Sequence, residues 1–336
     1  MLPTRKLGPF TVSAIGLGCM NLSHAYDVAP GEAEAGRLLN KALDLGVTLL
    51  DTAALYGGGA NERLIGRSVM HRRREFTLAS KCVLDMVDGK RVLDGRPAAI
   101  ARTLDAALAR LGTDHIDLYY LHRLDRTVPI EESVGALVRA KEAGKIGAIG
   151  LSEMSADTLR RAHAVHPIAA MQTEYSPMVR NVEIAVLDAT RELGTVLVAF
   201  SPLSRGLLAG AIRSDAYAPG DIRFTMPRFA GAALTDNLKL IDRFVALSAS
   251  LNMPPATLGL AWLLARAPHV IALPGTRNEA HLAQDLQAAT VSLEQGTVNE
   301  IDAIFVPGAI KGRRYAPAMQ AQVDTELLPE ELADAD

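Results

Sequence analysis

The chain has 336 residues, 49% of them hydrophobic and 4% aromatic, which suits one large α/β domain or two average ones. Its formal net charge of −3 argues against a nucleic-acid partner and against binding to an anionic membrane surface. The two cysteines, Cys19 and Cys82, are too few for a disulfide framework and favour a reducing, cytoplasmic location. No apolar run approaches the roughly 18 residues that a membrane-spanning helix needs.

The stretch RKLGPFTVSAIGLGCMNLSHA (5–25) bears a loose likeness to a signal peptide, with a basic start and an apolar middle. Pro9, Thr11 and Ser13 interrupt the apolar part. We therefore interpret KLGPFTVS (6–13) as a β-hairpin and AIGLGC (14–19) as a first strand.

Beyond this start, helical and apolar strand-like runs alternate along the chain. Helices are predicted over 31–46, 60–71, 97–112, 130–144, 156–165 and 182–194. The strand-like runs after AIGLGC are VTLLD (47–51), FTLASK (76–81), IDLYYLH (116–122), IGAIGLS (146–152), IAAMQTE (168–174), VLVAFS (196–201) and VIALPGT (270–276). Eight short strands alternating with helices favour an α/β fold of the (β/α)8 TIM-barrel type.

An open doubly wound sheet is the alternative, and it requires a G-x-G-x-x-G motif after the first strand. GLGCMN (16–21) breaks that motif at its last position, which favours the barrel. We expect the N-terminal hairpin to close the bottom of the barrel. The loop from Pro202 to about Leu234, after the seventh strand, is too long for a simple connector and predicts a lid or clamp. We expect one domain over residues 1–323 and a disordered acidic tail over 324–336.

Three consecutive βα units place Asp51, Lys81 and His122 at strand ends, and Tyr56 follows Asp51 in a glycine-rich turn. Barrel enzymes carry their chemistry at the carboxyl ends of the strands, so we expect these side chains to converge. A lysine ammonium lowers the pKa of a neighbouring tyrosine, and an aspartate keeps that lysine charged. A histidine can donate a hydrogen bond to the carbonyl oxygen that the tyrosine protonates. The set suits protonation of a carbonyl while another group delivers a hydride.

Each of these residues also has a purely structural interpretation. Asp51 and Lys81 can form a structural ion pair, Tyr56 can be a turn residue, and His122 can be a rim histidine with satisfied hydrogen bonds. Their occurrence in order at successive strand ends favours the catalytic interpretation.

The surrounding motifs resemble the aldo-keto reductase family of NAD(P)H-dependent (β/α)8 oxidoreductases. The resemblance extends from about Lys6 to Gly308 and rests on DTAALYGGGANERLIG (51–66), SK (80–81), LYYLHRLD (118–125), VPIEESVGALVRAKEAGKIGAIGLSE (128–153), QTEYS (172–176), FSPLSRGLL (200–208) and LPGTR (273–277). It implies reduction of an aldehyde or ketone to an alcohol. In that reaction Tyr56 would be the proton donor, Lys81 and Asp51 its tuning pair, and His122 the group that orients the carbonyl.

The same resemblance implies a binding site for NADPH. Ser152 and Gln172 would hold the nicotinamide carboxamide, and Phe200 would stack under the ring. Cys19, Met20 and Asp51 are expected beside the nicotinamide. The belt near the pyrophosphate would comprise Ser201, Pro202, Leu203, Arg205, Gly206 and Leu208.

Gly275, Thr276 and Arg277 open the last helical unit, and backbone N–H groups with a hydroxyl and an arginine suit a phosphate. The resemblance makes this the 2′-phosphate site and favours NADPH. The alternative is that Thr276 only caps the helix while Arg277 faces solvent. Downstream, Gln284 precedes Asp285, which replaces the family's adenine-contacting asparagine and leaves NADH possible.

The substrate pocket is predicted from Met20, Tyr26, Tyr56, His122, Met178 and Phe224. Pro177 and Met178 stand where relatives carry a leucine–tryptophan pair, and a flexible thioether predicts a wider opening. No single fixed charge is required to face the substrate, so we expect a neutral, fairly bulky aldehyde or ketone. The histidines show no spacing for a metal site, and no metal is expected.

Two other functions fit the sequence. An NADPH-binding redox sensor with weak turnover would use the same cofactor site to regulate another protein. A lysine-dependent aldolase would use Lys81 as a Schiff-base nucleophile, which must be deprotonated. The expected pairing with Asp51 opposes that deprotonation.

Overall fold

The computed structural model describes residues 2–87 and 89–333. Its central sheet has eight parallel strands, in the spatial order β3 (Leu17–Gly18), β4 (Leu49–Asp51), β5 (Thr77–Cys82), β8 (Ile116–Leu121), β9 (Ile146–Ser152), β10 (Ala170–Glu174), β11 (Val196–Phe200) and β12 (Val270–Leu273). A parallel bridge between Ile15, just before β3, and Ala272 in β12 joins the two edges into a barrel. The predicted (β/α)8 fold is confirmed.

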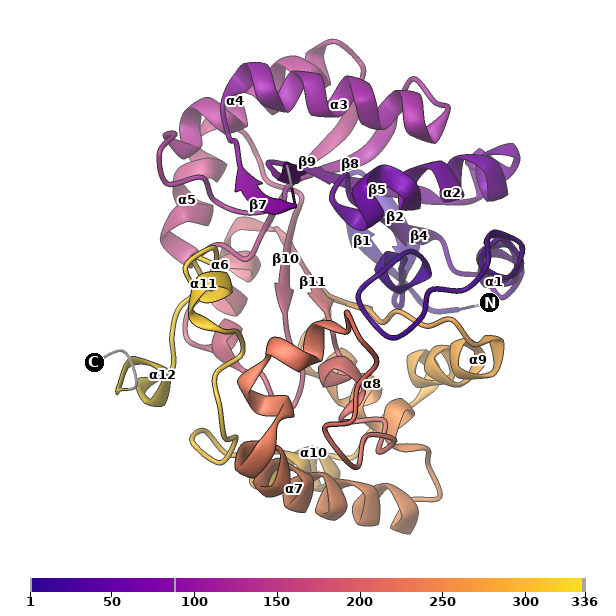
Figure 1. Ribbon diagram of the computed structural model, residues 1–336, viewed down its shortest axis with the longest axis vertical. Helices are drawn as coiled ribbons and strands as arrows, with labels where there is room; N and C mark the ends of the chain where they lie inside the picture. Colours follow the sequence, from indigo (N-terminus) through magenta and orange to yellow (C-terminus); the bar gives the residue numbers. More distant parts are fainter. Residues whose placement is uncertain (1, 88, 334–336) are drawn as a thin grey trace.

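Helices surround the strands, and the short C-terminal α12 lies outside this ring (Figure 1). The α-helices of the described residues are α1 (Glu32–Asp44), α2 (Ala60–Val69), α3 (Pro97–Leu111), α4 (Ile130–Glu142), α5 (Ala156–Val165), α6 (Val186–Leu193), α7 (Gly231–Ser250), α8 (Pro255–Arg266), α9 (Glu279–Gln287), α10 (Gln295–Ile304), α11 (Pro317–Gln320) and α12 (Pro329–Ala333). Within the described ranges, no single helix is long and apolar enough to cross a membrane, and only the α7–α8 pair, bent by 91°, meets that test jointly.

The N-terminal hairpin is formed by β1 (Thr4–Leu7) and β2 (Phe10–Ser13), which pair antiparallel. Leu7 and Val12 are fully buried in one apolar cluster with inward-facing strand residues such as Leu118 and Ile271. The hairpin therefore closes one end of the barrel, as expected, and leaves the other end for a site.

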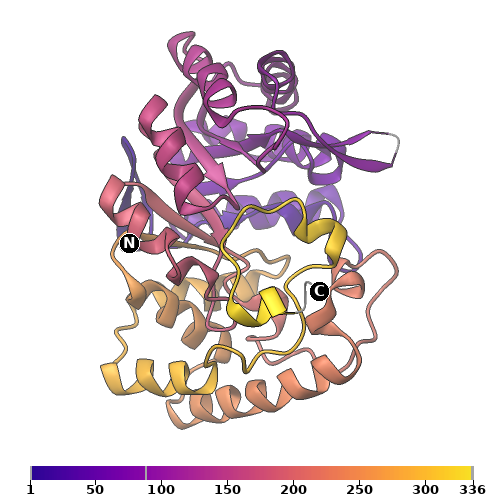
Figure 2. The same cartoon turned by 90° about the vertical axis from the view of Figure 1, so that its left-hand side faces the viewer.

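A second hairpin follows β5 and was not predicted. It consists of β6 (Leu84–Val87) and β7 (Lys90–Leu93), paired antiparallel. Figure 2 shows it projecting from the end of the barrel opposite the N-terminal hairpin. The Asp-Gly dipeptide at 88–89, between two partly apolar runs, is a sequence signal for such a hairpin.

The long segment after β11 runs from residue 201 to residue 230, where α7 begins. It contains three short 3-10 turns, at 204–206, 222–225 and 227–229. Its Ile222 N–H donates to the Ala25 carbonyl (2.9 Å), and its Asp221 carboxylate accepts from the Asp27 N–H (3.1 Å). These bonds join the loop to the β3–α1 segment across the open end of the barrel.

We expected a disordered acidic tail from residue 324, but its first residues form hydrogen bonds to the start of α5. The Asp324 carboxylate accepts hydrogen bonds from the Ser155 backbone N–H (3.1 Å) and hydroxyl (2.9 Å) at the start of α5. Glu326 accepts from the Ala156 N–H (2.8 Å) there, and Glu331 is buried. Carboxylates at a helix N-terminus satisfy free N–H groups and the helix dipole, which composition alone does not reveal. Residues 334–336 of the predicted tail lie outside the described residues.

Candidate active site

The carboxyl ends of three neighbouring strands bring the predicted polar residues together. Asp51 ends β4, Lys81 lies near the end of β5, and His122 follows β8; all three are buried. Tyr56 is reached by the turn after β4. Gly57 in that turn has φ +58°, a left-handed conformation that favours glycine and explains the glycine-rich sequence.

Lys81 lies at the centre of the group. Its Nζ forms an ion pair with Asp51 Oδ1 and donates to the Thr52 carbonyl (2.9 Å) and to Tyr56 Oη (3.3 Å). The other carboxylate oxygen of Asp51 accepts from Gln172 Nε2 (2.8 Å). The ammonium is thus fixed against the phenol by contacts on several sides.

Two histidine rings flank the Tyr56 ring. The His122 ring meets it edge-on, with centroids 5.9 Å apart and an interplanar angle of 82°. The His24 ring lies at 5.6 Å, tilted by 41°. The Nδ1 atoms of both histidines are buried without a hydrogen-bond partner in the described part of the chain.

Burial and neighbouring charges set the protonation states of the group. Burial raises the pKa of Tyr56 and outweighs the opposing Lys81 charge, so the net direction differs from the lowered pKa expected from sequence. Burial opposes the charge on Lys81, but Asp51 and Tyr56 hold its pKa above the ordinary value. Burial, followed by the charges of Arg123 and Lys81, holds the pKa of His122 well below its ordinary value. Near pH 7 the tyrosine is a phenol, the lysine is charged and the histidine is neutral.

Two residues of the first turn of α2 form hydrogen bonds to the neighbours of Asp51 and Lys81. Asn61 Oδ1 accepts from the Thr52 hydroxyl (2.6 Å), and Glu62 Oε1 accepts from the Ser80 hydroxyl (2.6 Å). Thr52 and Ser80 are the chain neighbours of the aspartate and the lysine. The asparagine–glutamate pair therefore holds the ends of β4 and β5 in place.

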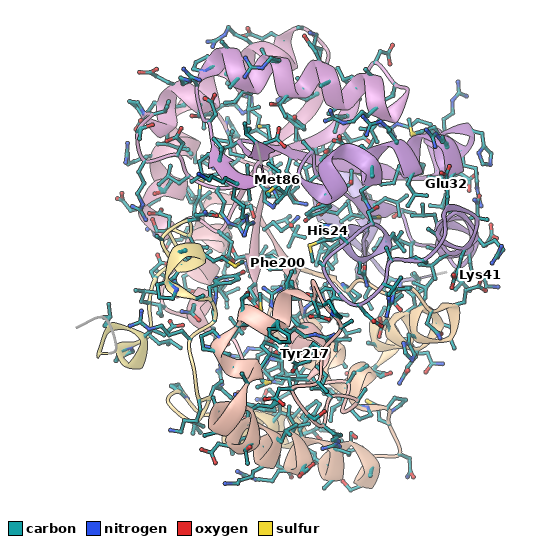
Figure 3. The ribbon with its side chains drawn as sticks, in the orientation of Figure 1. His24, Glu32, Lys41, Met86, Phe200 and Tyr217 are labelled. Atoms are coloured by element: carbon teal, nitrogen blue, oxygen red, sulfur yellow. The ribbon has the colours of Figure 1, made fainter. Side chains whose placement is uncertain are left out.

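A cavity of about 840 Å³ lies above these side chains, within the usual size range of ligand sites. Figure 3 shows His24, Met86 and Phe200 around the centre of the barrel, where this cavity opens. Most of the predicted site residues line it: Cys19, Met20, Tyr26, Asp51, Tyr56, His122, Ser152, Gln172, Phe200, Ser201, Pro202, Leu203, Arg205, Gly206, Gly275, Thr276, Arg277, Gln284 and Asp285.

Apart from the enclosed Lys81, three predicted site residues do not line the cavity. Leu208 is fully buried in the apolar core between the barrel and its helices. Met178 is buried and lines a separate pocket beside Arg228 and Phe305, so the wider opening predicted from it is not formed there. Phe224 lies on a 3-10 turn with 67% of its surface exposed and does not line the cavity.

Several cavity residues were missed by the sequence analysis. They include Asn21, His24, Met86, Arg91, Arg123, Tyr315 and Met319. Arg123 could have been predicted as a cavity residue, because it directly follows His122 just after β8. Tyr315 comes from the irregular segment after α10, and its hydroxyl accepts from Arg205 Nη2 (3.1 Å). No periodic pattern in the sequence places that segment against the site.

The residues predicted to bind the 2′-phosphate, Gly275, Thr276 and Arg277, lie just before α9. The side chain of Asn278, not that of Thr276, caps this helix by accepting from the N–H groups of Ala280 and His281. Thr276 Oγ1 accepts from the Asn278 N–H (3.1 Å), and Arg277 pairs with Asp27 (2.9 Å).

Asp285, on the cavity side of α9, is 96% buried, since only 4% of its surface is exposed. Burial raises the pKa of its carboxyl group to about 7. Within the described ranges, no three histidine, cysteine or acidic side chains cluster in a way that would hold a metal ion.

The fold and site together define a barrel oxidoreductase, and the comparison with known proteins agrees. The Aldo/keto reductase family model matches residues 14–305. The chain belongs to the aldo/keto reductase family.

Among curated relatives, the chain is 41% identical over 338 residues to "Aldo-keto reductase yakc [NADP(+)]" of Schizosaccharomyces pombe, covering 98% of this chain and 99% of that protein. It is 38% identical over 340 residues to aldo-keto reductase str7 of Strobilurus tenacellus, covering 98% and 99%. Among solved structures, the glycerol dehydrogenase AKR11B4 from Gluconobacter oxydans superposes with a TM-score of 0.83 at 28% identity, covering 93% of this chain and 99% of the other.

Proposed function

We propose that this protein is an NADPH-dependent carbonyl reductase that converts an aldehyde or ketone to an alcohol, with Tyr56 as the proton donor. The observation that carries the proposal is the Tyr56 hydroxyl, 3.3 Å from the buried Lys81 ammonium and flanked by His122 in one cavity. Membership of an oxidoreductase family and the NADP(+) in the name of the Schizosaccharomyces pombe relative support the choice of cofactor.

The residues present fit a nicotinamide dinucleotide. The cavity runs from the Tyr56 side of the barrel to the start of α9, so one ligand can reach both. Ser152 and Gln172 offer a hydroxyl and an amide for the carboxamide group. Thr276 and Arg277 offer a hydroxyl and a guanidinium for the 2′-phosphate. When bound, the reduced cofactor supplies the hydride for the carbonyl carbon.

The protein's own residues then handle the proton. Tyr56 gives its phenolic proton to the carbonyl oxygen as the carbon receives the hydride. The Lys81 ammonium stabilises the phenolate that remains, and Asp51 keeps that ammonium charged. The neutral His122 presents a ring N–H to the carbonyl oxygen and fixes its position.

Schiff-base chemistry at Lys81 is disfavoured by the same contacts. A nucleophilic lysine must lose its proton, yet Asp51 and Tyr56 hold the pKa of Lys81 above the ordinary value. The amine is also covered, since Lys81 is 1% exposed and does not line the cavity.

The decisive experiment compares wild type, Tyr56→Phe and the control Tyr217→Phe, which loses a phenol outside the cavity. NADPH binding is followed by fluorescence and turnover by absorbance at 340 nm with a panel of aldehydes. We expect all three proteins to bind NADPH and Tyr56→Phe to lose about 10²- to 10⁴-fold in kcat.

Equal turnover by Tyr56→Phe and wild type would contradict the role of Tyr56. NADPH binding by wild type without reduction of any carbonyl would instead favour the redox-sensor function. Trapping of a substrate on Lys81 by borohydride without NADPH would favour the aldolase.

A further inference from the structure

The arginines around the cavity differ in how their charges are compensated. Five arginines line it. Three of them form ion pairs with carboxylates: Arg205 with Glu174, Arg223 with Asp221, and Arg277 with Asp27. Arg91 and Arg123 form no ion pair with any carboxylate of the described residues. Two cavity-facing cations are therefore without a carboxylate counterion among the residues that the structure describes.

The Arg123 side chain is fixed by hydrogen bonds to uncharged groups, which leave its positive charge uncompensated. It follows His122 directly, and only 9% of its surface is exposed. Its Nη1 donates to the His122 carbonyl (2.6 Å) and to the Ser152 hydroxyl (3.3 Å), both of which are uncharged acceptors. The remaining guanidinium N–H groups have no partner among the described residues. A buried charge in this condition costs free energy that an anionic ligand would offset.

Arg91 approaches the cavity from the β6–β7 hairpin. On β7, Lys90 and Val92 are exposed, whereas Arg91 and Leu93 are partly buried. Arg91 pairs in register with Met86, which Figure 3 shows above the centre of the barrel. Within the described ranges the Arg91 side chain makes no hydrogen bond. Its guanidinium is therefore available to a ligand.

Both charges act on the side chains that carry the proposed chemistry. Arg91 and Arg123 line the same cavity, and burial followed by the Arg123 charge lowers the pKa of Arg91. Arg123 and Arg91 also contribute to the low pKa of His122, after burial. Arg123 is bonded to the His122 carbonyl, and both cations line the cavity that Tyr56 and His122 also line.

In the described part of the chain, no free carboxylate of the cavity lining is paired with these cations. Its acidic lining residues are Asp51 and Asp285. Asp51 is paired with Lys81. Asp285 lies on α9 after β12, which is separated from β8 by three strands in the sheet order.

We propose that Arg91 and Arg123 form a subsite for an oxyanion group on the substrate, so that the preferred substrates are aldehydes or ketones bearing a carboxylate or a phosphate ester. The planar guanidinium fork matches both groups. This inference rests on the proposed carbonyl reduction and replaces the neutral substrate expected from sequence.

Three para-substituted benzaldehydes test the subsite: 4-formylbenzoate, 4-formylphenyl phosphate and the neutral 4-formylbenzamide. The readout is kcat/KM for each anion divided by kcat/KM for the amide. We expect wild type to prefer an anionic aldehyde, and Arg91→Gln and Arg123→Gln to lower that ratio at least about tenfold each. Lys90→Gln is the matched control, because it removes one positive charge from the exposed face of the same strand. Arg91→Lys should recover part of the ratio.

A calorimetric titration measures the affinity of the protein for benzoate and for benzamide, and so tests the subsite without turnover. Tighter binding of benzoate, lost in Arg123→Gln, supports the inference. Reduction of the amide with a ratio near one that neither variant changes would overturn the inference while the carbonyl reductase proposal stands. Reduction of none of the three aldehydes, with benzoate bound no better than benzamide, would also overturn the inference, and the aldehyde panel described above then decides the carbonyl reductase proposal separately. Preference for the carboxylate or for the phosphate assigns the natural group.

Discussion

Replacing Asp285 by asparagine is expected to change how the stability of the protein depends on pH. The carboxyl group lies in the wall of the cavity, almost fully buried, and no hydrogen bond to its side chain is formed within the described residues. Burial raises its pKa from the ordinary 3.8 to about 7. Asparagine keeps the size and shape of the side chain and does not ionise, so Asp285→Asn removes the titration, and the effect of its amide donors on stability does not depend on pH.

The sign and size follow from the linkage between proton binding and folding. The folded-state pKa is raised, so the folded state favours the protonated acid. Its contribution to stability is fully present below pH 3.8 and is lost as the pH rises through about 7. A difference of about three pH units corresponds to about 4 kcal/mol in all, of which about 2–3 kcal/mol is lost between pH 5 and pH 8.

Urea unfolding of wild type and Asp285→Asn at pH 5 and pH 8 measures this loss. We expect Asp285→Asn to gain about 2–3 kcal/mol of unfolding free energy relative to wild type between the two pH values. Other titrating groups are common to both proteins and cancel in the comparison. A difference between the two proteins that is the same at pH 5 and pH 8 would refute the assignment of a raised pKa to Asp285.

Two further predictions concern the buried charges of the site. Lys81→Met leaves the Asp51 carboxylate without its cation and should lower the unfolding free energy by about 3–5 kcal/mol, measured by urea unfolding. Adding Asp51→Asn should recover part of that loss, and a loss unchanged in the double variant would contradict the ion-pair account. The neutral His122 should show a constant Hε1 chemical shift between pH 5.5 and 8 by NMR, and a titration centred near pH 6.5 would contradict its low pKa.

The barrel and the centre of the site were predictable because both arise from a repeated local pattern. Each βα unit shows an apolar run that ends in a polar residue, and parallel strands gather those ends on one rim. The convergence of Asp51, Lys81 and His122 could therefore be predicted from the sequence. The sequence did not predict that the pKa of Tyr56 is raised. That shift depends on how deeply the phenol is buried as well as on the Lys81 charge.

The wall of the cavity was predicted less well, because part of it comes from segments outside the repeat. Arg91 and Met86 lie on a hairpin inserted between β5 and α3, and Tyr315 and Met319 lie in the C-terminal segment. Met178 was assigned by alignment to a motif, and its buried position is decided by packing against residues far along the chain. Long-range packing of this kind leaves no periodicity to detect.

The proton-transfer group and Arg91 are held by different parts of the fold. The Asp51–Lys81–Tyr56 group is held by strands β4 and β5 and by the first turn of α2, all within the repeating units. Arg91 is carried by a hairpin whose outer face is exposed. A substitution on the hairpin can therefore alter the charge offered to a substrate without moving the lysine or the tyrosine. Selectivity for a substrate's charge is thus expected to vary through Arg91 on the hairpin without displacing Lys81 or Tyr56, whereas Arg123 is tied to the proton-transfer group by its hydrogen bond to the His122 carbonyl.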